Sequence, residues 1–232
     1  MRKIGLIGGL GPESTLDYYK RITHFFQARS GGLATPDILI YSVSLAEAFD
    51  LMGAEAWEEL ADWLVAKLEA LASAGAEFAA ITANSPHIVF DAVAARSPLP
   101  LVSIVDATLA EARRLGFRKI GLLGTRFTMR SNFFGAQFAP AGIAVVVPDE
   151  GGQALIQDRL AQEIERGIFR DETRQEILGL LDGLVARDGI EAAILGCTEL
   201  PLILEPKHTR LPLLNTTELH VAAICRACQG EG

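Results

Sequence analysis

Residues 190–201 read Ile190-Glu191-Ala192-Ala193-Ile194-Leu195-Gly196-Cys197-Thr198-Glu199-Leu200-Pro201. A run of small apolar residues ends here in Gly-Cys-Thr-Glu, which indicates a buried strand with a thiol at its carboxyl end. In an open α/β sheet, ligands bind at this end of the strands. Cys197 is therefore a candidate nucleophile or acid/base group. The alternative is a small buried apolar residue, which is a frequent role of free cysteine.

A similar pattern occurs earlier in the chain. Residues 3–8 match residues 119–124 at an offset of 116, and residues 77–85 match residues 191–199 at an offset of 114. Two matched strands at nearly the same offset indicate a duplicated unit. We therefore predict an α/β fold of two pseudo-symmetric, doubly wound, mainly parallel-sheet halves with the site between them.

The first half would comprise residues 1–98 and 211–232, and the second half residues 99–210. The apolar patterns predict strands near 3–7, 38–43, 78–82, 101–105, 119–124, 144–147 and 191–196. They predict helices near 16–29, 54–74, 107–115, 158–166, 172–188 and 218–228, the last returning to the first half. The duplication places Ala83 at the position in the first half that Cys197 occupies in the second.

The turn after the first strand is rich in glycine, but it matches the dinucleotide-binding fingerprint poorly. Ser14 stands where the third glycine of that fingerprint belongs, and no acidic residue ends the second strand. A close backbone approach to a small anionic ligand, at Gly9, is the better interpretation.

Composition excludes several classes of protein. The net charge is −8 and no basic stripe is present, which argues against nucleic acid as a partner. Only three cysteines occur, and Cys225 and Cys228 have too few neighbouring ligands for a metal, so we predict neither a disulfide framework nor a metal site. The apolar run at the N-terminus is too short for a signal peptide or membrane helix, so we expect a cytoplasmic protein without a membrane partner.

Four segments resemble the aspartate/glutamate racemase family nearly end to end. They are Ile4-Gly5-Leu6-Ile7-Gly8-Gly9-Leu10-Gly11-Pro12-Glu13-Ser14-Thr15, Leu122-Leu123-Gly124-Thr125-Arg126-Phe127-Thr128-Met129, Leu195-Gly196-Cys197-Thr198-Glu199 and Asn215-Thr216-Thr217-Glu218-Leu219-His220. The resemblance implies a cofactor-independent racemase that uses two cysteine thiols, on opposite faces of a planar carbanion, in place of pyridoxal phosphate. It also implies a small acidic amino acid as substrate and a homodimer. Stereoinversion needs two acid/base groups of this kind, and a cysteine pKa can be tuned for the task.

One departure from the family matters for this chemistry. The family's first-half motif is typically Cys-Asn-Thr-x-His, whereas this chain reads Ala83-Asn84-Ser85-Pro86-His87. Thr82 and Ser85 are nearby hydroxyls, but an unassisted alcohol is a far poorer base than a thiolate. Three alternatives stay open: a neighbouring group or water replaces the thiol, the reaction is one-sided, or Ala83 is an introduced substitution.

The resemblance also implies roles for the polar residues around these two positions. Five would donate hydrogen bonds to substrate carboxylates and to the developing enolate: Asn84, Ser85, Thr125, Thr128 and Thr198. Their alternative role is that of helix caps or turn residues. Glu199 and His220 would orient Cys197 or gate the site, and His87 would support the first-half motif or be a structural histidine.

Two further functions are compatible with a single thiol. A decarboxylase of malonate-type substrates needs only one cysteine to protonate the carbanion that loss of carbon dioxide leaves. A non-catalytic protein that binds acidic amino acids would keep the pocket without the chemistry.

Overall fold

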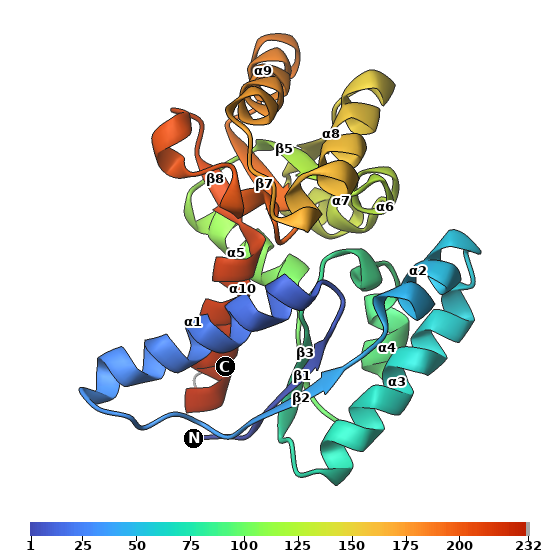
Figure 1. Ribbon diagram of the computed structural model, residues 1–232, viewed down its shortest axis with the longest axis vertical. Coiled ribbons are helices and arrows are strands. Elements are labelled where there is room, and N and C mark those ends of the chain that lie inside the picture. Colours follow the sequence, from blue (N-terminus) through green and yellow to red (C-terminus); the bar gives the residue numbers. More distant parts are fainter. Residues whose placement is uncertain (231–232) are drawn as a thin grey trace. The chain divides into compact units, whose positions relative to one another are not determined.

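The structure, a computed structural model, describes residues 1–230 and consists of two compact units (Figure 1). The first unit is Met1–Ile104 together with the segment that begins at Thr217, and the second is Val105–Thr216. Each unit contains one four-stranded sheet in which every pairing is parallel. The predicted α/β class with two parallel-sheet halves is confirmed.

The sheet of the first unit has the strand order β2-β1-β3-β4. Its strands are β1 (Ile4–Gly8), β2 (Ile38–Ser42), β3 (Phe78–Ile81) and β4 (Leu101–Val102). Its helices are α1 (Pro12–Ser30), α2 (Leu45–Gly53), α3 (Trp57–Ser73), the 3-10 helix η1 (Ser85–Val89), α4 (Phe90–Arg96) and α10 (Thr216–Gln229).

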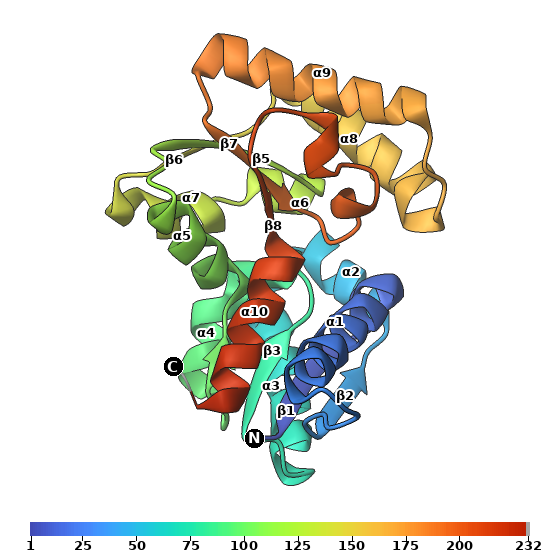
Figure 2. The same ribbon diagram turned by 90° about the vertical axis from the view of Figure 1, so that its left-hand side faces the viewer.

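Helices cover both faces of this first sheet (Figures 1 and 2). Tyr18 of α1 and Ile224 of α10 share one buried cluster with Ile4 and Phe78 of the strands, so α1 and α10 pack on the same face. Helix α3 packs against the opposite face through a row of buried leucines that recurs every three or four residues. Cys225 and Cys228 belong to this cluster too, where they pack as buried apolar residues.

The second unit repeats this plan with the strand order β6-β5-β7-β8. Its strands are β5 (Lys119–Gly124), β6 (Ala144–Val146), β7 (Ala192–Gly196) and β8 (Leu213–Asn215). Its helices are α5 (Ile104–Arg114), α6 (Arg126–Arg130), α7 (Phe133–Phe138), η2 (Ala139–Ala141), α8 (Glu150–Gln162), η3 (Ile164–Arg166), α9 (Asp171–Asp188), η4 (Leu200–Leu202) and η5 (Pro206–His208). Helices α8 and α9 share the buried core of β7 (Figure 2).

The strand registers of the two units are the same. Ile4 pairs with Phe78 in the first sheet, and Ile120 pairs with Ala192 in the second. These pairs are related by the offsets of 116 and 114 that the sequence repeat shows. The register therefore makes Ala83 the equivalent of Cys197. Ala83 lies two residues beyond Ile81, the partner of Ile7, and Cys197 lies two residues beyond Leu195, the partner of Leu123.

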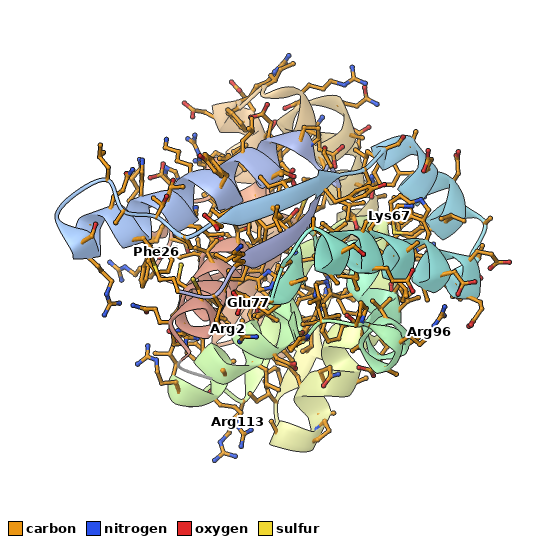
Figure 3. The ribbon with its side chains drawn as sticks, turned by 90° about the horizontal axis from the view of Figure 1, so that it is seen from below. Arg2, Phe26, Lys67, Glu77, Arg96 and Arg113 are labelled. Atoms are coloured by element: carbon orange, nitrogen blue, oxygen red, sulfur yellow. The ribbon has the colours of Figure 1, made fainter. Side chains whose placement is uncertain are left out.

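The start of each central strand is also fixed in the same way. In the first unit the Lys3 backbone N–H donates to the Glu77 carboxylate at 2.7 Å, and the Arg2 guanidinium donates to the Glu77 carbonyl at 2.8 Å (Figure 3). In the second unit Glu191 accepts from the backbone N–H groups of Arg118 and Lys119. These contacts lower the pKa of the Glu191 carboxyl. The duplication thus extends from the strands to their hydrogen-bonded ends.

The boundaries between the units differ from those suggested by the sequence. Residues 101–102 form the last strand of the first sheet, so that unit continues past residue 98 to Ile104. Residues 213–215 pair with β7, so the second unit continues past residue 210 to Thr216. Both boundaries depend on which strands pair with one another. The apolar pattern of one strand does not show which other strand it will pair with.

Some helices also differ from expectation. Helix α1 begins at Pro12, because proline is well suited to the first turn of a helix and the preceding Gly11 adopts a positive φ. Helix α2 was not expected. Helix α8 begins at Glu150, before the predicted start at residue 158, because Asp149 caps it by accepting from the Gly152 N–H. Among the described residues, no helix is long and apolar enough to cross a membrane.

The turn between β1 and α1 requires glycine for a steric reason. Gly9 has a φ of 83°, and a Cβ there would lie 2.3 Å from the carbonyl oxygen of Val43. Its N–H donates to the Thr15 hydroxyl at 2.8 Å. The close approach is therefore between two backbone segments of the same unit. A contact between this N–H and a ligand would require Thr15 to release it.

We expect Gly9→Ala to destabilise the protein more than Gly31→Ala. Gly31 also has a positive φ, of 64°, but a Cβ there meets nothing within 4 Å. Both changes place alanine in the left-handed region at a cost of about 1–2 kcal/mol, and only Gly9→Ala adds an overlap costing about 1–3 kcal/mol. Urea denaturation of both variants measures the difference, and equal losses would contradict the steric explanation.

Candidate active site

The carboxyl ends of β5 and β7 bring two predicted site residues together. Gly124 pairs with Gly196, so Thr125 and Cys197 are the next residues on adjacent strands. Both glycines are needed for this approach, because a Cβ on Gly124 would lie 2.9 Å from the Gly196 carbonyl oxygen. The strands therefore end in close contact and present Thr125 and Cys197 at one edge of the sheet.

The Cys197 thiol is buried and bonded to a carboxylate. Its Sγ donates to Oε2 of Glu199 at 3.0 Å, and the side chain is 6% exposed. Burial raises the pKa of the thiol well above its usual value, and the charge of Glu199 and the hydrogen bond that it accepts raise this pKa further. Because an elevated pKa favours the protonated form, Cys197 is a neutral thiol at neutral pH.

A second acidic residue, Glu165 of η3, lies near this pair. Partial burial raises the pKa of the Glu165 carboxyl, and the charge of Glu199 raises it further. Glu165 in turn contributes to the raised pKa of Cys197. The sequence did not single out Glu165, since it follows no motif and lies far from Cys197 along the chain. Only the folded unit brings the two carboxyl groups and the thiol into one electrostatic environment.

The threonines of this site have contacts within the protein. Thr125 caps α6, because its hydroxyl accepts from the Thr128 N–H at 3.2 Å. Thr128 is fully buried, and its hydroxyl lies 3.2 Å from that of Thr125. The Thr198 hydroxyl donates to Oε2 of Glu199 at 2.8 Å. The capping alternative therefore describes Thr125, while substrate binding by these three residues stays a prediction.

In the first unit, the equivalent strand ends surround Ala83, which is 7% exposed. The Thr82 hydroxyl is completely buried and donates to the Ile7 carbonyl at 3.0 Å, while the Ser14 hydroxyl donates to the Thr82 carbonyl at 3.0 Å. These contacts give Thr82 a structural role between β1 and β3. Its predicted participation in catalysis gains no support from this geometry.

Asn84 and Ser85 continue from Ala83 into η1. Asn84 is 4% exposed and directly precedes this short helix, and Ser85 is its first, half-buried residue. The Asn84 carbonyl accepts from the His87 N–H at 2.9 Å. The motif predicted from the sequence is thus one compact turn, and its role in binding substrate stays a prediction.

A buried pair of histidines supports this turn. His87 Nδ1 lies 2.9 Å from the Ala83 carbonyl oxygen, and its Nε2 lies 3.3 Å from the Ile104 backbone N. His220 Nδ1 lies 2.8 Å from the Tyr18 hydroxyl, and its Nε2 lies 2.9 Å from the Val102 carbonyl oxygen. The two imidazole rings meet edge to face with centroids 6.2 Å apart.

The partners determine where each ring carries its hydrogen. A backbone N–H can only donate and a carbonyl can only accept, so His87 is protonated at Nδ1 and His220 at Nε2. Burial lowers the pKa of His87 to about 3, with a further lowering from His220, and burial lowers the pKa of His220 to about 4. Both rings are therefore neutral and fully hydrogen-bonded within the first unit. The predicted role of His220 in orienting Cys197 gains no hydrogen bond from this arrangement.

Comparison with known proteins agrees with these motifs. The sequence profile described as Asp/Glu/Hydantoin racemase matches residues 7–224. The chain belongs to this racemase family. A crystal structure of a putative Asp/Glu racemase from Yersinia pestis shares 34% sequence identity, covers 99% of this chain and all of its own, and superposes with a TM-score of 0.91.

Two more relatives extend the comparison. An aspartate racemase homologue from Pyrococcus horikoshii OT3 is 35% identical, with 99% of this chain and 100% of the other covered and a TM-score of 0.87. The broad specificity amino-acid racemase RacX of Bacillus subtilis (strain 168) is 24% identical over 219 residues, which cover 92% of each chain. Racemases are isomerases, so the predicted enzyme class agrees with the family.

Among residues 1–230 of this racemase-family chain, no group of three or more His, Cys, Asp and Glu side chains is arranged to hold a metal ion. The chemistry available at the described strand ends is that of a thiol, carboxyl groups and hydroxyls. Glu199 joins them, because Cys197 and Thr198 both donate to its Oε2.

We expect acid to destabilise the protein through His87 and His220. Because their pKa values are lowered on folding, the unfolded chain binds more protons below about pH 6.5, and stability falls as the pH decreases toward 4. Each histidine contributes a slope of at most about 1.4 kcal/mol per pH unit. Denaturant unfolding at pH 7, 6 and 5 measures the effect.

The variant His220→Gln should lower stability at pH 7 and flatten its pH dependence, because the titrating ring is gone. His24→Gln is the matched control, since His24 is an exposed histidine of α1. An undiminished slope in His220→Gln would contradict the assignment of neutral, buried histidines.

Proposed function

We propose that this protein is a cofactor-independent amino-acid racemase that acts on aspartate, glutamate or both, with Cys197 as its sulfur acid/base. The observation that carries the proposal is the position of Cys197 at the carboxyl end of β7, bonded to Glu199, in a chain of the racemase family. A thiol at this strand end lies where ligands of parallel sheets bind.

In the proposed reaction, the Cys197 thiolate removes the Cα proton of one enantiomer. The C–H electron pair stays on the substrate as an enolate, which hydrogen-bond donors stabilise. Asn84, Ser85, Thr125, Thr128 and Thr198 are the proposed donors. In the reverse direction the neutral thiol returns a proton to Cα. The raised pKa keeps Cys197 protonated, so the thiol is available as a proton donor, and proton removal requires that the thiolate form first.

Ala83 makes inversion of the substrate more difficult than exchange of its Cα proton in the proposed reaction. Inversion requires a proton donor on the side of Cα opposite Cys197, and alanine at the position equivalent to Cys197 has no proton to give. A water molecule or a neighbouring hydroxyl must deliver that proton. We therefore propose that exchange of the Cα proton through Cys197 is faster than net inversion.

We include a homodimer in this proposal. Strand β2 is an edge of the first sheet, and Ile40 and Tyr41 on it are 40% and 39% exposed. An exposed apolar strand edge is a common site of association. Light scattering coupled to size-exclusion chromatography tests this part. The cytoplasmic location stays a prediction.

We expect each enantiomer of aspartate and glutamate to show different exchange in deuterated water. The enantiomer that presents its Cα–H to Cys197 should incorporate deuterium faster than it inverts, because only one side carries a thiol. Proton NMR measures exchange, and chiral chromatography measures inversion. No exchange from any of the four substrates would overturn the proposed function.

Two variants define the roles of the equivalent positions. Cys197→Ala should reduce exchange by about a hundredfold or more, the usual contribution of a general acid/base. Ala83→Cys should raise inversion relative to exchange, because it supplies a proton donor at the position equivalent to Cys197. Cys225→Ala is the matched control for loss of a buried thiol, since Cys225 lies in the core of the first unit.

A decarboxylase is the second candidate, and Ala83 is the observation that favours it. Loss of carbon dioxide from a substituted malonate leaves the C–C electron pair on carbon as an enolate, and the Cys197 S–H protonates it. This reaction needs one proton donor only. Release of carbon dioxide that Cys197→Ala abolishes, without exchange of amino-acid Cα protons, would favour this candidate over the racemase.

A further inference from the structure

Two adjacent residues near the start of α9 hold two different segments of the second unit. Thr173 is 2% exposed, and its hydroxyl donates to Oε2 of Glu163, the residue that follows α8. Arg174 is half-buried, and its Nε donates to the Ile203 backbone carbonyl at 2.9 Å. Glu163 leads into η3, and Ile203 follows η4. One turn of α9, the helix beside α8 in Figure 2, therefore contacts both segments.

The backbone of Glu163 closes the turn that contains η3. Its carbonyl accepts from the N–H groups of Arg166 and Ile168, each at 3.0 Å. Ile164, the first residue of η3, is 1% exposed and belongs to the same buried cluster as Cys197. A contact that holds Glu163 therefore also holds a segment that packs in the same cluster as the thiol.

The side chain of Glu163 is buried, and its partners come from two helices. Arg159 of α8 lies with Nη1 3.5 Å from Oε1, while Thr173 of α9 donates to Oε2. Arg159 also donates two hydrogen bonds to Glu176 of α9, at 2.7 and 3.1 Å. Hydrogen bonds to a charged acceptor are stronger than neutral ones, and a buried carboxylate that loses one is destabilised. The Thr173 hydroxyl is therefore needed to keep Glu163, and with it η3, in place.

A series of backbone hydrogen bonds connects Arg174 to the thiol residue. The Ile203 N–H donates to the Leu200 carbonyl at 3.1 Å, and the Leu200 N–H donates to the Cys197 carbonyl at 3.1 Å. Leu200 and Ile203 are fully buried. The planar guanidinium of arginine donates in fixed directions, so the Arg174 bond to the Ile203 carbonyl fixes the far end of this series.

We propose that Thr173 and Arg174 of α9 are positioning residues for the Cys197 thiol. Thr173 acts on η3 through Glu163, and Arg174 acts on the segment after β7 through the Ile203 carbonyl. This inference rests on the proposed function and deepens it, because both residues act on the acid/base thiol through other residues and take no part in proton transfer.

A purely structural role for these two residues predicts a different result. Loss of either contact would then lower thermal stability, but the folded variant would keep the wild-type surroundings of Cys197. Positioning predicts that the thiol itself changes in the folded variant. Burial is the largest cause of the raised pKa of Cys197, so a loosened segment should lower this pKa and speed alkylation.

The experiment uses the full chain with Thr173→Val and Arg174→Met. Valine has nearly the shape of threonine without its donor, and methionine keeps a long side chain without the guanidinium. Thr173→Ser restores the hydroxyl and is the matched rescue. Arg187→Met is the control for loss of an arginine, because Arg187 lies in the last turn of α9 and its side chain is 51% exposed.

Two measurements are made on each variant. Iodoacetamide alkylation over a range of pH, with the Cys197 peptide followed separately from those of Cys225 and Cys228 by mass spectrometry, gives the rate and the pKa of the thiol. Deuterium incorporation at Cα of aspartate and glutamate gives kcat and KM for exchange. Circular dichroism identifies the variants that are folded.

We expect Thr173→Val and Arg174→Met to lower the pKa of Cys197 and to speed its alkylation at neutral pH by about tenfold, because the thiolate is the reactive form. The kcat for exchange should fall by about tenfold to a hundredfold, the usual effect of a small displacement of reacting groups, with a smaller change in KM. Thr173→Ser and Arg187→Met should match the wild type.

A folded variant in which Cys197 is alkylated as in the wild type would overturn the positioning role of the substituted residue, whatever its thermal stability. Faster alkylation with an unchanged kcat would overturn it as well. Should Thr173→Val or Arg174→Met not fold, Glu163→Gln or Arg174→Lys takes its place, with the same expected directions, because these changes keep the shape or the charge of the side chain.

Failure of the proposed function would look different. A wild-type protein that exchanges no acidic amino acid removes the racemase proposal. Alkylation of Cys197 then decides by itself whether α9 positions the thiol, since this readout needs no substrate.

Discussion

The parallel pairing of a central strand with its neighbour in each unit is the constraint on which the rest of the structure depends. Ile4 opposite Phe78 and Ile120 opposite Ala192 set the register, and every residue beyond the strand ends follows from it. Parallel strands end at the same edge of their sheet, so loops that are far apart in the sequence become neighbours there. Thr125 meets Cys197 for this reason. A shift of one residue would turn the buried side chains to the opposite face.

At the end of β7 this register places a thiol against a buried carboxylate, an arrangement that is costly for stability and useful for chemistry. Burial of the thiol raises the pKa of Cys197, and the charge of Glu199 and the hydrogen bond that it accepts raise this pKa further. A protein selected only for stability would gain from an apolar pair at these positions. Perturbed titration of this kind is typical of functional sites, and it agrees with the family to which the chain belongs.

The first unit shows the same framework with different chemistry. Two neutral histidines hold the turn that contains Ala83, and His87 fixes the Ala83 carbonyl directly. The turn is therefore kept in a defined conformation although its thiol is absent. Compared with the family motif, alanine stands in place of cysteine at Ala83 and one hydroxyl residue stands in place of another at Ser85. The proposed inequality between proton exchange and inversion follows from the missing thiol.

The sequence by itself determined the duplication, the α/β class and the family resemblance, because periodic apolar runs and local motifs are properties of neighbouring residues. From this resemblance follow two predictions, that Cys197 is a site residue and that Ala83 stands where the family has its first thiol. Only the tertiary structure decided that residues 101–102 and 213–215 complete the two sheets, that the Thr82 hydroxyl bonds to Ile7, and that Glu165 lies near Glu199. These facts depend on pairing and burial between segments distant in the chain, and a linear pattern carries no information about which distant group will fill a given space.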